Sequence, residues 1–145
     1  MDKNIFDNKV KEMVEKKPGL FSLHSDNMAS TAMIKDVEEY YNIILPDSYK
    51  EYLKQYGGGY FGFIIVYSCD CNGMFYIKNK VAKESALENA FLPIIDLETG
   101  DLIGFKILGG KCQNTVALYL HEENKLQDLG MDFYDVLLRY GLNCI

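Results

Sequence analysis

The carboxylates that fall in predicted turns are the residues best placed to do chemistry. They lie near three chain reversals: Asp70 at the first, Asp96, Glu98 and Asp101 at the second, and Glu122 and Glu123 at the third. Two such acids held close together form the acid and base of many hydrolases. His121 precedes the last pair, where a neighbouring carboxylate can tune an imidazole towards proton transfer. Acids are also common in turns because they suit turn geometry, and we favour this interpretation.

The candidate metal ligands are cysteines and histidines: Cys69, Cys71, Cys112, Cys144, His24 and His121. On a strand, Cys69 and Cys71 would point to the same face, as paired zinc ligands do. A structural zinc site normally adds a second closely spaced ligand pair, which this sequence lacks. We therefore expect free thiols, with no bound metal and no cofactor.

The glycine run Gly57–Gly59 has the composition of a phosphate-binding loop but stands in the wrong place for one. Phosphate-binding loops follow a strand and lead into a helix, whose N-terminus binds the anion. Here the run follows a predicted helix and precedes a predicted strand, so we interpret it as a structural turn. The common nucleotide-binding, serine-hydrolase and zinc-protease motifs are also absent from the sequence. We expect no catalytic residue and no enzymatic activity.

The charge balance is acidic: the 145 residues include 15 basic and 21 acidic ones, a net charge of −6. Phosphate contacts supply most of the affinity for nucleic acid, so we do not expect nucleic-acid binding. The same charge suits a basic protein partner, although solubility alone would also account for it. The N-terminal residues are charged throughout, and no apolar run is long enough to span a bilayer. We therefore expect a cytoplasmic protein without membrane contact.

Amphipathic periodicity predicts the helices that must position these groups. Apolar residues at helical spacing predict helices at 4–16, 31–42, 46–56 and 131–140. In the helix predicted at 46–56, Pro46 suits the first helical position and Gly57 suits the C-terminal cap. The side chains of Tyr49, Tyr52 and Leu53 form one apolar-aromatic stripe along this helix. The segment 79–90 has helix-forming residues and is either a short helix or an ordered loop.

Aromatic and β-branched runs bounded by turn residues predict the strands. They are Phe61–Cys69, Met74–Ile77, Phe91–Asp96, Leu102–Leu108, Thr115–His121 and Lys125–Leu129, the first two joined by a hairpin at Asn72-Gly73. Sequential strands with short links predict an antiparallel sheet. We therefore expect a single α+β domain over residues 1–145, with helices packed on one side of the sheet and helix 4–16 among them.

The helix at 46–56 and its glycine run resemble the signature segment of the SUKH superfamily. The matching residues are Leu45, Pro46, Tyr49, Lys50, Tyr52, Leu53, Gly57, Gly58 and Gly59. The family usually has Asn before paired glycines, whereas this chain has Tyr56 and three glycines. With the order of elements, the resemblance covers roughly residues 30–140. It implies a small α+β domain of the type found in fungal cell-wall-assembly regulators and bacterial immunity proteins, and none of its motif residues is catalytic.

The resemblance implies a binding function: an immunity protein, or antitoxin, that neutralises a cognate polymorphic toxin. Many such toxins are nucleases, which tend to be basic because they bind phosphates. The alternative is a regulatory scaffold of the cell-wall-regulator type with an endogenous protein partner. The third possibility, from another class, is a small hydrolase that uses the turn carboxylates. Alternate turns of a meander share one end of the sheet, so we expect the first and third acidic turns on one rim and the second on the opposite rim. The segment 79–90 could change this order. We predict that these turn carboxylates, with Tyr67 or Tyr119 beside them, contact the basic surface of the toxin.

Overall fold

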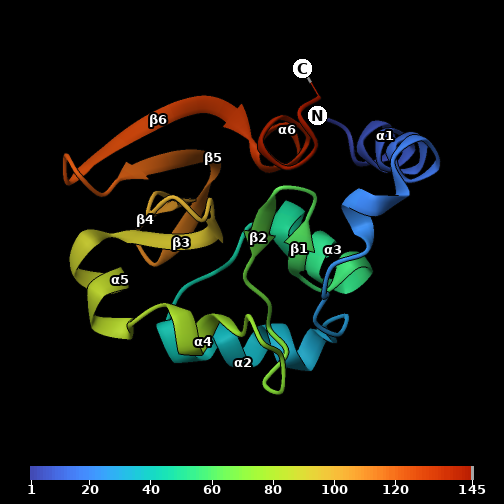
Figure 1. Cartoon of the computed structure of the whole chain (residues 1–145). Coiled ribbons are helices and arrows are strands. Elements are labelled where there is room, and N and C mark those ends of the chain that lie inside the picture. The colour runs from blue at the N-terminus through green and yellow to red at the C-terminus, as the bar shows by residue number, and fades with distance from the viewer. Residues whose placement is uncertain (145) are drawn as a thin grey trace.

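The fold is a six-stranded antiparallel meander with helices packed against it (Figure 1), seen in a computed structural model that describes residues 1–144. The strands pair in sequence order, and all neighbours are antiparallel. The strands are β1 Gly59–Phe61, β2 Ile64–Val66, β3 Phe91–Asp96, β4 Leu102–Leu108, β5 Lys111–Leu120 and β6 Lys125–Asp132. The helices are α1 Lys3–Lys16, α2 Thr31–Tyr41, α3 Asp47–Tyr56, α4 Ile77–Lys80, α5 Lys83–Asn89 and α6 Phe133–Val136. The predicted α+β class and antiparallel sheet are confirmed.

Helix α3 begins one residue later than predicted. Pro46 stands at the N-cap with extended backbone angles (φ −64°, ψ 147°), and Asp47 is the first helical residue. Its first-turn carboxylate complements the helix dipole. The preceding Leu45 N–H donates to the Glu38 carboxylate at 2.8 Å, which ties the entry of α3 to the end of α2.

The aromatic stripe of α3 lies in the core. Tyr49, Tyr52 and Leu53 are buried. The Tyr49 ring packs against Phe105 of β4 and Phe133 of α6, at centroid distances of 5.9 and 5.6 Å. Its hydroxyl group donates to the Tyr67 carbonyl oxygen at 2.6 Å, which satisfies the polar end of an otherwise apolar contact.

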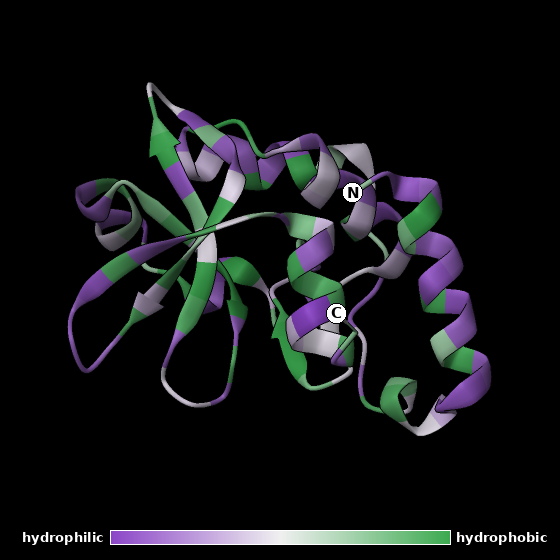
Figure 2. Ribbon diagram, turned by 90° about the horizontal axis from the view of Figure 1, so that it is seen from above, coloured by the Kyte–Doolittle hydropathy of each residue, from purple (hydrophilic) through white to green (hydrophobic). Residues whose placement is uncertain are grey.

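Helix α1 joins this core through one face. Figure 2 shows α1 as a mostly hydrophilic helix at the margin of the molecule. Its Phe6 is buried and packs against Tyr134 at 4.7 Å and against Phe61 at 6.1 Å, measured between ring centroids. The hydrophobic face thus docks on α6 and β1, as an amphipathic helix requires.

The glycine run after α3 allows a loop to cross it closely. Gly57 has φ +87°, and a Cβ there would overlap the carbonyl oxygen of Asp26. Ser25 forms an isolated bridge with Gly59, so residues 24–27 cover the outer edge of β1. The glycine run is therefore a site of close backbone packing, where a side chain would not fit.

The predicted strand Phe61–Cys69 is wrong, because the chain reverses inside it. β1 and β2 form a tight hairpin through Gly62, which has φ +60°. A Cβ at Gly62 would overlap the carbonyl oxygen of Gly141, and the Phe63 N–H donates to that oxygen at 2.8 Å. The turn at Gly62 is therefore stabilised by a contact with the C-terminal helical segment. Local sequence propensity does not include this contact and so does not predict the turn.

The predicted hairpin at Asn72-Gly73 is also wrong. Residues 70–76 form a loop that is held by one isolated parallel bridge, between Tyr76 and Ser68, two residues after the end of β2. The N–H groups of Met74 and Phe75 donate to the Asp26 carboxylate, so they do not form a ladder. After this loop, the segment 79–90 contains the end of α4 and the whole of α5. Of the two alternatives considered for it, a short helix or an ordered loop, the helix is therefore the one observed.

The last elements keep their predicted type with shifted bounds. β3 and β4 occupy the predicted residues, whereas β5 starts four residues earlier, because Gly109-Gly110 makes a tight turn. β6 extends to Asp132, which caps α6 by accepting from the Asp135 N–H. The predicted helix at 131–140 therefore begins at Phe133 and continues as a π-helical segment, Leu137–Gly141.

Candidate functional site

One face of the sheet carries an apolar surface that the core does not use. Leu102 of β4 pairs with Tyr119 of β5, which in turn pairs with Leu126 of β6, so the three side chains line up across the outer face. Phe91 and Pro93 of β3 lie beside them at the same cavity. The opposite face of these strands carries core residues such as Phe105 and packs on α3 and α6.

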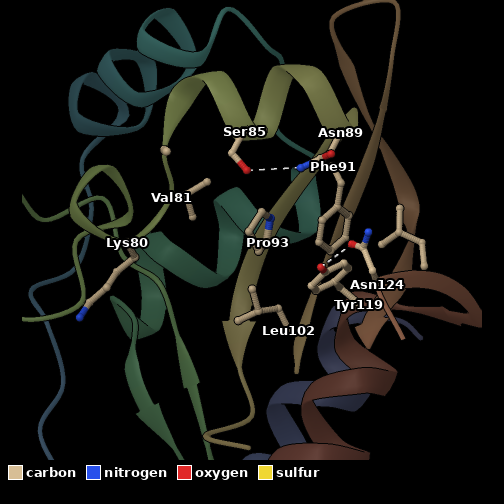
Figure 3. Close-up of a pocket in the computed structure, with 12 residues that line it drawn as sticks. Lys80, Val81, Ser85, Asn89, Phe91, Pro93, Leu102, Tyr119 and Asn124 are labelled. Carbon is tan, nitrogen blue, oxygen red and sulfur yellow. Dashed lines mark hydrogen bonds between the residues drawn. The ribbon is translucent and has the colours of Figure 1, made fainter. Parts of the chain in front are cut away.

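This outer face and helix α5 enclose a cavity of about 600 Å³, which we call the outer cavity (Figure 3). Its lining residues are Lys80, Val81, Ala82, Ser85, Ala86, Asn89, Phe91, Pro93, Leu102, Tyr119, Asn124 and Leu126. Strands β3–β6 supply the floor, and the segment from Lys80 to Asn89 supplies one wall. The volume lies within the range of small-molecule and side-chain pockets in proteins.

The polar groups of the outer cavity bind one another. The Tyr119 hydroxyl group donates to Asn124 Oδ1 at 2.7 Å, and Asn89 Nδ2 donates to Ser85 Oγ at 3.3 Å (Figure 3). Lys80 is the one charged residue among the twelve that line the cavity within residues 1–144. Its ammonium group lies 5.7 Å from the ring centre of Phe75 and points away from the cavity. The interior of the cavity is therefore neutral.

Two acidic loops meet at one end of this surface. The β3–β4 loop and the β5–β6 loop are adjacent, since Asp101 accepts from the His121 backbone N–H at 3.1 Å and lies 2.9 Å from His121 Nδ1. The carboxylates gathered here, which we call the acidic rim, are Asp96, Glu98, Asp101, Glu122 and Glu123. The order expected from the sequence is wrong: the second and third acidic turns share this end, because the Gly109-Gly110 turn lies between them and a meander returns to the same end at every second turn.

The acidic rim is ordered by its own hydrogen bonds. Asp96 Oδ1 accepts from the Glu98 N–H at 2.7 Å, and Glu98 Oε1 accepts from the Tyr60 hydroxyl group at 2.9 Å. The hydrogen bond from the His121 side chain, helped by the one from its backbone, lowers the pKa of Asp101. Glu122 and Glu123 are exposed. The rim is therefore a group of neighbouring carboxylates, of which Asp101 has its charged form favoured by His121.

Asp70 and Tyr67, predicted as partner contacts, lie inside the molecule. Each is 5% exposed. The Asp70 carboxylate accepts from the backbone N–H groups of Asn27 and Asn72, at 2.9 and 3.1 Å. Neither side chain contributes to the surface formed by the acidic rim and the outer cavity, whereas Tyr119 does.

Asp26 carries a buried carboxylate that the sequence analysis did not single out. Its carboxylate accepts from Ser68 Oγ at 2.6 Å and from the backbone N–H groups of Met74 and Phe75 at 3.1 and 3.0 Å. His24 Nε2 lies 2.9 Å from the same group. Together, the Asp26 and Asp70 carboxylates join the loop before α2 to the loop after β2.

The cysteines do not gather into a site. Cys69 is buried and Cys71 is exposed, because the chain bends after β2 and the two thiols do not share the face of a strand. Among residues 1–144, no three Cys, His, Asp or Glu side chains are arranged to hold a metal ion. In the same residues, no helix combines the length and apolar character that crossing a bilayer requires.

A family profile now identifies the relationship. The profile SUKH_6, described as SMI1-KNR4 cell-wall, matches residues 31–137. The chain belongs to the SUKH superfamily. No curated protein matches it. The SUKH match spans α2 to α6 and includes both the acidic rim and the outer cavity.

Apart from Tyr119, the residues of the outer cavity were not singled out from the sequence of this SUKH protein, although a signal exists. In an antiparallel sheet with one solvated face, apolar and polar residues alternate. The run Phe91–Ile95 is apolar at every position, which indicates that both faces of β3 are covered. The structure places Leu92 in the core, and Phe91 and Pro93 at the outer cavity.

Proposed function

We propose that this SUKH protein is a non-catalytic binding domain that neutralises a basic toxin, acting as its immunity protein in the cytoplasm. The observation that supports the proposal most directly is the convergence of two acidic loops beside a neutral, apolar cavity. Surfaces with an apolar centre and a charged border are the usual form of a protein–protein interface.

Electrostatics favours a basic partner of nuclease type. Nuclease domains that bind phosphates carry positive surfaces. The acidic rim, on a protein of net charge −6, attracts such a surface over long range and speeds association. Occupying the phosphate-binding surface of the toxin would then exclude its substrate, so that no catalysis by this chain is required.

The second candidate is a regulatory scaffold with an endogenous protein partner. The words "cell-wall" in the description of the matching family profile favour it. Such a scaffold could use the same acidic rim and outer cavity, so the two candidates differ in the identity of the partner.

The test is co-expression with the product of the adjacent gene. We expect that product to arrest growth alone, and to be neutralised when this protein is present. The two purified proteins should form a complex of defined stoichiometry in size-exclusion chromatography with light scattering. If the adjacent product is harmless alone and forms no complex, the immunity function is wrong and the scaffold candidate gains support.

A further inference from the structure

We propose that the outer cavity receives one aromatic side chain from a loop of the partner, and that basic residues flanking this side chain contact the acidic rim. The identity of the partner rests on the proposed function, whereas the recognition chemistry rests on the cavity itself. The occupant is thus a basic–aromatic–basic segment of a protein.

The floor of the outer cavity is suited to an aromatic ring. The rings of Phe91 and Tyr119 lie with centroids 6.5 Å apart and planes inclined by 37°. Pro93, Leu102 and Leu126 complete an apolar floor beside them. A third ring can meet these faces edge-on or offset, the arrangements that aromatic rings prefer. Binding anchors in interfaces are most often large side chains seated in such pockets.

The polar groups of the outer cavity point to a neutral anchor. Within residues 1–144, no buried side-chain nitrogen or oxygen atom lacks a hydrogen-bond partner. The Tyr119 hydroxyl group is already bonded to Asn124. No carboxylate lines the cavity, so a charged side chain placed inside it would lose its hydration without gaining an opposite charge.

The flanking charges follow from the position of the acidic rim. Leu102, in the cavity floor, directly follows Asp101, and Asn124, in the cavity wall, directly follows Glu123. A chain that inserts one ring into the cavity therefore brings its neighbouring residues beside these carboxylates. Arginine suits this position best, since its guanidinium group binds a carboxylate through two parallel hydrogen bonds.

Three short peptides test this chemistry without knowledge of the natural partner: acetyl-Arg-Phe-Arg-amide, acetyl-Arg-Ala-Arg-amide and acetyl-Glu-Phe-Glu-amide. NMR titration should show the first peptide shifting backbone amide signals of residues 81–89 and 119–126. Burying a phenyl ring should make its Kd at least about ten-fold lower than that of the alanine peptide. The Glu-Phe-Glu peptide should bind at least about ten-fold more weakly than the Arg-Phe-Arg peptide, because its negative charges are repelled by the carboxylates of the acidic rim.

A pair of tryptophan variants distinguishes the outer cavity from the rest of helix α5. Ser85 lines the cavity, whereas Leu87 lies on the same helix, is exposed and does not line it. Ser85→Trp should fill the cavity and weaken binding of the Arg-Phe-Arg peptide by about ten-fold or more. Leu87→Trp should leave its Kd within about two-fold of the parent protein. Equal urea midpoints for the two variants establish that both are folded.

The inference is overturned if the phenylalanine and alanine peptides bind equally, or if Ser85→Trp leaves the Kd of the phenylalanine peptide unchanged. It is also overturned if the shifted signals lie outside the cavity. A failure of the adjacent gene product to bind this protein, with the peptide results as expected, would reject the immunity function and leave the recognition chemistry standing.

Discussion

Replacing Asp26 by alanine should cost far more stability than its place in a loop suggests. Its buried carboxylate accepts hydrogen bonds from Ser68 Oγ and the Phe75 N–H, both on buried residues, and from the Met74 N–H. Each buried donor left without an acceptor costs about 1–3 kcal/mol. With two buried donors and a third nearer to solvent, we expect Asp26→Ala to lower the free energy of unfolding by about 3–5 kcal/mol.

The measurement is urea unfolding followed by circular dichroism, with Asp36→Ala as the matched control. Asp36 forms an ion pair with Lys78 at 2.6 Å, but its side chain is 62% exposed. Exposed pairs contribute about 0–1 kcal/mol, so Asp36→Ala should unfold close to the parent protein. Hydrogen exchange at the Phe75 amide gives a local readout, since it should accelerate in Asp26→Ala and stay unchanged in Asp36→Ala.

A loss of less than about 1 kcal/mol for Asp26→Ala, equal to that of Asp36→Ala, would refute the view that Asp26 joins the two loops. If Asp26→Ala does not fold, Asp26→Asn serves in its place, because one amide oxygen still accepts a hydrogen bond. The loss should then be smaller, with Phe75 exchange still faster than in the parent protein.

Three further predictions concern the core, the thiols and metal binding. Leu53 is fully buried, so Leu53→Ala should cost about 2–5 kcal/mol in urea unfolding, and a cost below about 1 kcal/mol would contradict its place in the core. Burial, together with the nearby Glu38 carboxylate, raises the pKa of Cys69 and of Cys112 to about 12. A thiol reagent at mildly alkaline pH should therefore modify the exposed Cys71 first and reach these two only on unfolding, and their rapid modification in the native protein would show the burial to be wrong. Elemental analysis after dialysis should find no stoichiometric zinc, and one zinc per chain would overturn this expectation.

Local sequence signals predicted the elements that depend on local interactions. β3 and β4 were predicted to the residue because the aromatic and β-branched runs at Phe91–Asp96 and Leu102–Leu108 flank an evident turn at Gly100. Helix α2 was predicted to within one residue because Ser30 is a strong N-cap, and its side chain accepts from the Met33 N–H. These features use contacts within a few residues of the chain.

The errors arose where distant residues override local preference. Asn72-Gly73 is a strong hairpin signal, yet Asp26, more than forty residues earlier, accepts hydrogen bonds from the N–H groups that the second strand would have used. The turn at Gly62 depends on the carbonyl oxygen of Gly141 at the other end of the chain. The assignment of the second and third acidic loops to opposite rims had another cause: the Gly109-Gly110 turn lies between them, so the chain returns to the same end of the sheet.

The candidate site was only half visible in the sequence for the same reason. Glu98, Asp101, Glu122 and Glu123 could be named as turn acids, and Tyr119 as their aromatic neighbour. That Asp101 lies against His121, and that Tyr119 faces a cavity walled by α5, depends on strand order and register. Both are tertiary properties that side-chain type does not determine.

The central claim is that the acidic rim recognises a basic partner, and association kinetics with the purified adjacent gene product test it most directly. One variant reverses Glu98, Asp101, Glu122 and Glu123 to lysine, and a matched control reverses Glu12, Glu15, Asp36 and Glu39, which are exposed and lie outside both the rim and the outer cavity. Each reversal adds two charges, so both variants change from −6 to +2 and carry the same net charge at different places.

We expect the rim variant to associate at least about ten-fold more slowly than the control at low salt, with the difference shrinking as salt screens the charges. Urea unfolding should show that both variants fold, with the rim variant slightly less stable because the Asp101 carboxylate, 27% exposed, also accepts hydrogen bonds from His121. If the rim variant and the control associate at the same rate at every salt concentration and both protect cells, the acidic rim is not the recognition surface.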